Sequence, residues 1–117
     1  MVIATVIASV VLALVAAASG IPKVMGTAQM VEEARHLGVP RIGYIAIGSL
    51  ELAAAVGLLA GLAVTPLGIA AATGIILMMI GAVASHVRVG DPYAAMAPAL
   101  TVGVAGAITL GLHLVTA

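Results

Sequence analysis

Long apolar runs alternate with short polar segments along this chain. A helix of about 20 mostly apolar residues crosses the roughly 30 Å hydrocarbon layer of a bilayer. Four runs reach that length and predict spans at about 2–21, 42–64, 67–86 and 98–115. Only one formally charged side chain, Glu51, lies inside these runs. The pattern predicts an all-α fold: a four-helix transmembrane bundle forming a single domain over residues 1–117.

Proline and glycine mark the ends of the runs. Thr65-Pro66 predicts a tight turn between the second and third spans, because proline is tolerated at a helix start. Gly90-Asp91-Pro92 is expected to end the third span. The first run ends in small residues, "LVAAASG", as signal peptides do. It is nevertheless longer than a usual signal core and no Lys or Arg precedes it, so we interpret it as a retained span.

The segment between the first two runs predicts a short amphipathic helix. Thr27 is a suitable N-cap, and Gly38 and Pro40 are expected to end the helix. Its apolar residues recur at helical spacing on one side, and its charged residues occupy the other: Met30, Val31, Ala34 and Leu37 against Glu32, Glu33, Arg35 and His36. Such a helix lies flat on the membrane surface, with its charges in solvent.

Composition supports a lipid environment and excludes several function classes. Hydrophobic residues make up 64% of the 117 positions and charged residues 7%, whereas soluble domains commonly carry about a quarter charged residues. With four basic and four acidic residues there is no basic patch, which argues against nucleic-acid binding. The absence of cysteine excludes disulfides and thiol redox chemistry by this chain alone.

The basic residues predict an orientation. Lys23, Arg35 and Arg41 lie between spans one and two, and Arg88 follows span three, so all four face the same side of the membrane. The positive-inside rule makes that side cytoplasmic, which places residues 22–41 and 87–97 in the cytoplasm and both termini outside.

Small residues predict close helix packing. Gly57 and Gly61 form a GxxxG pair in the second span. In the fourth span small residues repeat every four positions and are expected to form a packing ridge within the bundle or between two copies: Ala99, Gly103, Ala107 and Gly111.

Glu51 is the strongest candidate for a functional residue. It follows Arg41 by ten positions, which at 1.5 Å per residue places it about 15 Å deep, near the bilayer midplane. A carboxylate at that depth costs on the order of 2.5–3.5 kcal/mol, so it must face the bundle interior, be protonated or pair with a cation. Small neighbours, Gly48, Ala54 and Ala55, leave room beside it for a side chain, water or a ligand.

Three basic residues lie at the ends of spans on the same side of the membrane, and their side chains could extend toward Glu51: Lys23, His86 and Arg88. Together they predict a polar track into the bundle, with Glu51 and His86 as candidate catalytic residues and Lys23, Tyr44 and Arg88 as ligand-binding or supporting residues. Snorkelling of Lys23 and Arg88 to the headgroups is the alternative.

The other polar residues point to no metal site. Glu51 with His86 is too small a ligand set, and Met78 and Met79 are expected to fill the core. His86 and His113 both lie near the C-terminal ends of consecutive spans, which places them near opposite sides of the membrane and argues against a bis-histidine haem. We expect His113 at the membrane interface.

Five segments resemble the DoxX-like membrane proteins: "IPKVMG", "HLGVP", "LELAAAVGLL", "PLGIAA" and "GAVASHVRVGD", in that order over nearly the whole chain. The resemblance implies a four-helix transmembrane bundle. By motif, Lys23 matches the lysine after the first helix, Glu51 the glutamate of the second, and His86 with Arg88 the H-x-R of the third. The family takes its name from a subunit of a thiosulfate:quinone oxidoreductase, so the resemblance also implies an association with membrane redox complexes.

These observations lead to one principal function and three alternatives. The principal one is binding of a lipophilic small molecule, a quinone or lipid-like ligand, as a subunit of a membrane oxidoreductase assembly. No cofactor motif is evident, and the expected partners are the bilayer, the ligand, and a second copy or another membrane protein. The alternatives are an enzyme using Glu51 and His86 as general acid and base, a proton-coupled exporter, and a ligand-free accessory protein in which Glu51 pairs with Lys23 or Arg88.

Overall fold

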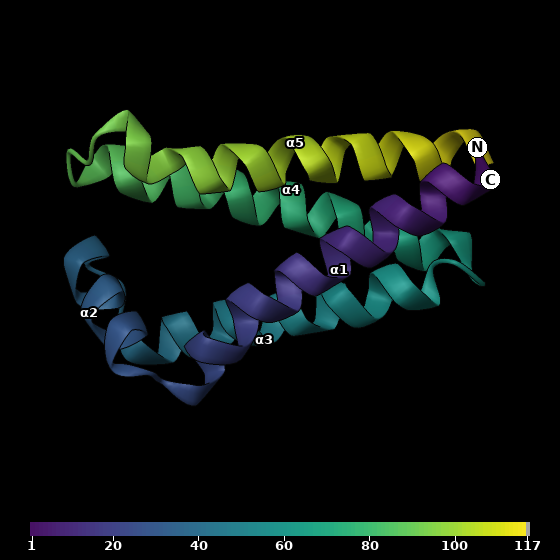
Figure 1. Ribbon diagram of the computed structural model, residues 1–117. Coiled ribbons are helices and arrows are strands. Elements are labelled where there is room, and N and C mark those ends of the chain that lie inside the picture. The colour runs from purple at the N-terminus through teal and green to yellow at the C-terminus, as the bar shows by residue number, and fades with distance from the viewer. Residues whose placement is uncertain (117) are drawn as a thin grey trace.

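The computed structural model describes residues 1–116, which form five helices joined by short turns. In chain order they are α1 (Val2–Met25), α2 (Ala28–Leu37), α3 (Arg41–Ala60), α4 (Thr65–Arg88) and α5 (Tyr93–Thr116) (Figure 1). Helices α1, α3, α4 and α5 are long and apolar enough to cross a membrane. The predicted all-α bundle of four long helices, with a short amphipathic helix between the first two, is confirmed.

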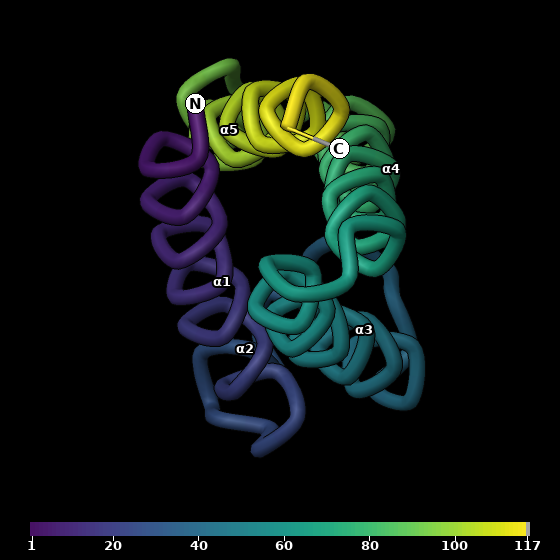
Figure 2. The backbone as a smooth tube through the Cα atoms, turned by 90° about the vertical axis from the view of Figure 1, so that its right-hand side faces the viewer, coloured from purple at the N-terminus to yellow at the C-terminus, as the bar shows by residue number. Residues whose placement is uncertain are grey.

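The four long helices form a ring when viewed end-on (Figure 2). Helix α1 packs against α3 and α5, and α4 packs against the same two helices from the other side. Both termini lie at one end of the bundle, and α2 lies at the opposite end with the α4–α5 turn (Figure 1). We call this second end the charged end, because it carries Lys23, Arg35, Arg41 and Arg88.

Large apolar side chains cover the outside of the ring. Ile3 and Leu14 on α1 and Ile42 on α3 are 65–76% exposed. Exposed large apolar residues occur along all four long helices, a larger apolar surface than a soluble monomer exposes, whereas hydrocarbon solvates such a surface at no cost. The chain is therefore an integral, multi-pass membrane protein.

The interior is built from small residues around a few large ones. Leu58 and Ile75 are almost fully buried, and alanines from α1, α3 and α4 fill the space around them: Ala13, Ala16, Ala54, Ala55 and Ala72. Small side chains let the helix backbones approach closely, which is the main source of helix association in lipid.

Two prolines fall inside helices, where the sequence predicted boundaries. Helix α1 continues past Pro22 to Met25, and Gly26 ends it in the left-handed conformation at φ 68°, with its N–H bonded to the Pro22 carbonyl. Helix α5 begins at Tyr93, so Pro98 lies in its second turn. Proline has no N–H, so α5 lacks the bond to the Ala94 carbonyl at this position, and the helix continues across the gap. Helix α3 ends at Ala60, four residues before the predicted limit.

Close approach occurs at two glycine pairs. An added Cβ at Gly61 would lie 2.3 Å from the Gly68 Cα, so the predicted packing at Gly61 is real and joins α3 to α4. An added Cβ at Gly20 would lie 2.7 Å from the Gly48 carbonyl oxygen, which joins α1 to α3. Without a side chain at these positions the backbones can touch.

The small-residue ridge predicted in the fourth span packs only in part. Gly103 faces Met79, but an added Cβ at Gly111 would meet nothing within 4 Å, and Ala107 is exposed. The reason is geometric: a four-residue step turns about 40° beyond a full helical turn, so the ridge winds away from the bundle. The buried positions of α5 are instead Gly106, Thr109 and His113.

Candidate functional site

The crossing of α1 and α3 brings the central charges together. Gly20 and Gly48 form the contact, and an added Cβ at Gly48 would lie only 2.7 Å from the Lys23 Cβ. Lys23 is three residues after Gly20 on α1, and Glu51 is three residues after Gly48 on α3. Residues three apart lie on one helix face. The continuation of α1 through Pro22 thus aims Lys23 into the bundle, on the face where Glu51 lies.

Lys23 and Glu51 form a buried ion pair. The Lys23 Nζ lies 2.9 Å from the Glu51 Oε1, and the two side chains are 14% and 4% exposed. Lys23 also donates to the Ser19 Oγ at 2.6 Å, one helical turn earlier, and to the Ser19 carbonyl at 3.4 Å. Its ammonium lies 5.6 Å from the centre of the Tyr44 ring, within cation–π range. The sequence left Lys23 and Arg88 as possible partners of Glu51, and in the structure the partner is Lys23.

Glu51 retains free acceptor capacity. The Lys23 ammonium lies close to Oε1 as the partner of an ion pair, but Oε1 receives no hydrogen bond within residues 1–116. A carboxylate offers about four lone-pair sites. The ion pair therefore offsets the charge of Glu51 without saturating its oxygens.

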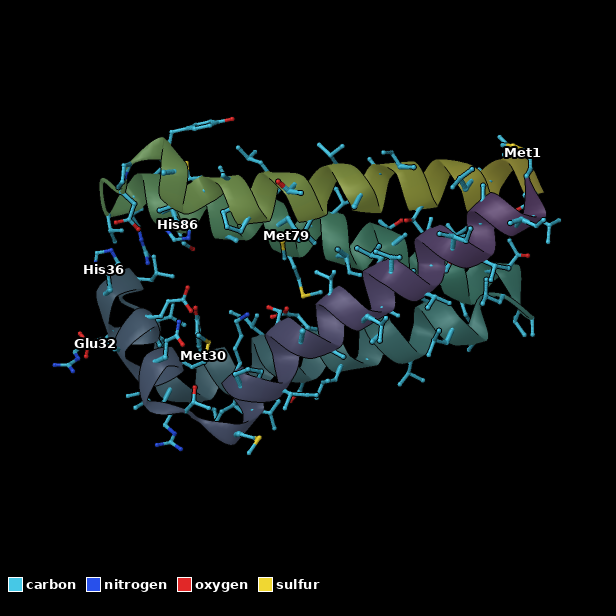
Figure 3. The ribbon with its side chains drawn as sticks, in the orientation of Figure 1. Met1, Met30, Glu32, His36, Met79 and His86 are labelled. Atoms are coloured by element: carbon cyan, nitrogen blue, oxygen red, sulfur yellow. The ribbon has the colours of Figure 1, made fainter. Side chains whose placement is uncertain are left out.

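A cavity of about 550 Å³ opens beside this pair. All five helices contribute to its wall, and Glu51, Lys23, Tyr44 and His86 all line it. The structure thus brings together four of the five predicted site residues. Most of the remaining wall is apolar, and Figure 3 shows Met79 pointing from α4 into the space between the helices. Met78 and Met79 pack against the buried core, as the sequence predicted, and both also line this cavity.

His86 is held by a residue that the sequence did not single out as functional. Its Nδ1 lies 2.6 Å from the Asp91 Oδ2, and the other oxygen, Oδ1, lies 2.6 Å from the His36 Nε2. Asp91 therefore bridges α2 to the end of α4, where Figure 3 shows His36 and His86 close to each other. We call Asp91, His36 and His86 the histidine clasp. The hydrogen bonds from His86 and then His36 lower the pKa of Asp91 below its usual value.

We predict that the histidine clasp fixes α2 in a pH-dependent manner. A carboxyl group with a lowered pKa stabilises the folded arrangement above its unfolded pKa of about 3.9, and that contribution is lost as pH falls through the lowered value. Spin labels on cysteines replacing the exposed Gln29 and Ala94 should give a narrow distance distribution from pH 7 to about pH 5, broadening well below pH 4. Asp91→Asn should be broad already at pH 7. A narrow distribution in that variant would contradict the clasp.

Arg88, the fifth predicted site residue, lies outside the cavity wall. Its guanidinium donates to the Leu37 carbonyl at the C-terminal end of α2, at 2.5 Å. A cation at this position also interacts favourably with the negative end of the helix dipole. Arg88 thus joins α4 to α2 beside the histidine clasp.

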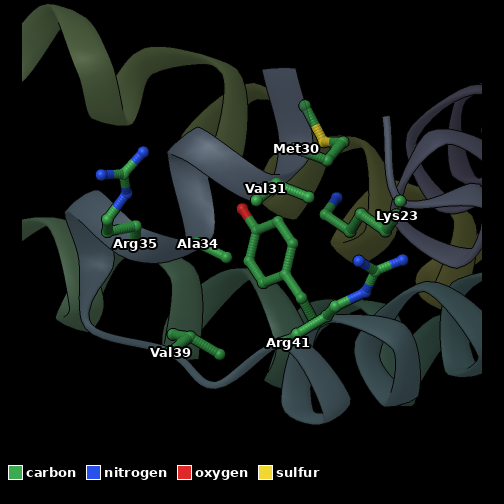
Figure 4. A pocket seen from close by; sticks show the side chains of 9 residues that line it. Lys23, Met30, Val31, Ala34, Arg35, Val39 and Arg41 are labelled. Carbon is green, nitrogen blue, oxygen red and sulfur yellow. The ribbon is translucent and has the colours of Figure 1, made fainter. Parts of the chain in front are cut away.

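A smaller pocket of about 320 Å³ lies against α2 and shares Lys23, Val39 and Tyr44 with the cavity. Figure 4 shows Arg35 across this pocket from Lys23 and Arg41. The Arg41 guanidinium packs against Gly26, where an added Cβ would lie 2.6 Å from one of its nitrogens.

His113 is buried inside the bundle, although its position in the sequence predicted an interfacial side chain. It is 2% exposed, its Nε2 lies 3.0 Å from the Ser9 Oγ, and its ring packs on Gly68. Only Gly68 leaves room for the ring, and that contact between α4 and α5 had no sequence signal. Within residues 1–116, no group of three or more His, Cys, Asp or Glu side chains is arranged to hold a metal ion.

Comparison with known families agrees with this architecture. The sequence matches the profile of the DoxX-like family over residues 7–112, which covers all five helices nearly completely. The chain belongs to the DoxX-like family. The resemblance inferred from the five segments is thereby confirmed. No curated protein and no solved structure matches this DoxX-like chain, so the arrangement of its site comes from its own residues.

Proposed function

We propose that this DoxX-like protein binds a lipophilic small molecule in the cavity beside the Lys23–Glu51 pair. The cavity itself carries the proposal: its volume of about 550 Å³ is within the usual 300–1,000 Å³ of ligand sites. Its wall is mostly apolar with a few convergent polar groups, as such sites are. The candidate is a molecule of the quinone class, in its quinone or hydroquinone form. Such a molecule is lipophilic and can reach the cavity through lipid or from the interface.

The proposal extends to a role as a subunit of a membrane oxidoreductase assembly. The chain has no cysteine, so a redox function requires a bound ligand or a partner protein to carry electrons. What this chain's residues supply is a binding pocket and fixed charges next to it. The family resemblance supports the assembly role, and the cavity supports the binding role.

Acid–base catalysis by Glu51 and His86 is the second candidate, since both residues line the same cavity. Each has a partner, however: Glu51 lies against Lys23, and the His86 Nδ1 is bonded to Asp91. A general acid or base must exchange its proton in each cycle. The bond to Asp91 engages Nδ1 and leaves the His86 Nε2 available, as in a histidine oriented by a carboxylate. It is therefore the Lys23–Glu51 pair and the mostly apolar wall that favour binding over catalysis.

The test is to fill the cavity with a side chain. Ala82 lines it, whereas Ala84, two residues along α4, is exposed on the outside. Protein released from native membranes should carry a stoichiometric lipophilic molecule by native mass spectrometry. We expect Ala82→Phe to lower its occupancy about tenfold or more, because the ring would occupy the ligand's space, and Ala84→Phe to retain it. Equal occupancy in both variants, or no bound molecule in the unmodified protein, would refute the proposal.

A further inference from the structure

The cavity wall offers hydrogen-bond acceptors to a ligand. The Glu51 Oε1 is buried and receives no hydrogen bond within residues 1–116. Glu33 of α2 places a second carboxylate on the wall, and the Tyr44 hydroxyl faces it. The Lys23 ammonium at 2.9 Å offsets the charge of the Glu51 oxygen, and a ligand with a hydrogen-bond donor would add the directed bond that this oxygen lacks.

Most hydrogen-bond donors on the cavity wall already have a partner within the protein. Lys23 donates to Ser19 and faces Glu51, and the Ser85 hydroxyl donates to the Gly81 carbonyl at 2.9 Å. The His86 Nδ1 carries its proton toward Asp91, because a carboxylate can only accept. In the neutral ring the His86 Nε2 is then a third acceptor. The Tyr44 hydroxyl faces Glu33.

We infer that the ligand carries a hydroxyl donor on its polar head, as a phenol or hydroquinone does, and gives that hydrogen bond to the Glu51 Oε1. This inference rests on the proposed function and specifies the head of the ligand. A molecule with only carbonyl or ether oxygens would place acceptors against Glu51 and Glu33. An ammonium head is disfavoured because Lys23 already supplies the cation and the chain has no Phe or Trp to stack on it.

Three compounds that share one decyl-substituted six-membered ring and differ only in their oxygen groups test this inference. The full chain in lipid nanodiscs, kept free of oxygen, is titrated with 2-decylhydroquinone, with its dimethyl ether and with 2-decylbenzoquinone. Binding is followed by the ¹³C-methyl signals of Met78 and Met79, which line the cavity. The methyl signals of Met1 and Met25, 70% and 72% exposed, report non-specific effects of the bilayer. Concentrations are expressed as mole fraction in the lipid, so that different partitioning cancels.

We expect the hydroquinone to bind about tenfold or more tightly than the ether and the quinone, the usual effect of a hydrogen bond to a charged group. In Glu51→Gln, whose amide both donates and accepts, this preference should fall to about threefold or less. The comparison of three ligands in the unmodified protein stands even where that variant fails to fold. Equal binding of all three would overturn the inference and leave the proposed function intact. Absence of any response at Met78 and Met79 would overturn both.

Discussion

Replacing Lys23 by methionine is expected to destabilise the protein by about 3–5 kcal/mol, because the substitution leaves Glu51 charged, buried and unpaired. The two side chains are only 14% and 4% exposed, so little solvent reaches the charge that remains. Total stabilities of proteins are about 5–15 kcal/mol, so this loss removes a large share. Reversible unfolding in mixed micelles, followed by circular dichroism, measures it.

Two further variants show whether the charge is responsible. In Lys23→Met/Glu51→Gln neither charge remains, and most of the lost stability should return. Arg35→Met removes a cation from the Arg35–Glu32 pair, whose side chains are 75% and 66% exposed, and should cost less than about 1 kcal/mol. If Lys23→Met were as mild as Arg35→Met, Lys23 would not be paired inside the bundle.

Adding one methyl group at Gly48 is expected to force α1 and α3 apart. The new Cβ would lie 2.7 Å from the Lys23 Cβ and 2.8 Å from the Gly20 carbonyl oxygen, and neither neighbour is the flexible end of a side chain. Overpacking of this kind costs about 1–3 kcal/mol. Because the same contact aligns Lys23 with Glu51, Gly48→Ala should also weaken ligand binding in the cavity.

Gly74→Ala is the matched control for Gly48→Ala. Gly74 also lies in a long helix, but an added Cβ there would meet nothing within 4 Å. Its substitution should leave stability unchanged or raise it by up to about 1 kcal/mol, the gain in helix propensity from glycine to alanine. The same unfolding measurement compares both variants. A gain of similar size at Gly48 would contradict the close crossing.

The architecture was predictable because lipid imposes a simple rule. A spanning helix needs a long apolar run, and the four runs that met this length all form helices. The limits of the helices were less predictable, since proline near a helix end is compatible with both a boundary and a continuation. At Pro22 that difference matters, because only the continued helix directs Lys23 toward Glu51.

The site was predictable in part. The depth of Glu51 required a buried environment, but Lys23, His86 and Arg88 were equally plausible partners by distance along their helices. Contact between Gly20 and Gly48 decides among them, and no pattern in the sequence marks which glycines of two helices will meet. The histidine clasp joins residues 55 positions apart and depends on where α2 lies over the bundle. The cytoplasmic orientation of the charged end stays a prediction.

The most direct test of the account is the proximity of Lys23 and Glu51 in a bilayer. Lys23 is the only lysine in the chain, so ¹⁵Nζ-lysine labels one site, and the carboxyl carbons of glutamate can be labelled with ¹³C. Solid-state dipolar recoupling should detect a strong coupling of this nitrogen to a glutamate carboxyl carbon, as a contact of 2.9 Å between Nζ and Oε1 requires, and Glu51→Gln should abolish it. No coupling in the unmodified protein, as expected for a lysine extended toward the headgroups, would contradict the account.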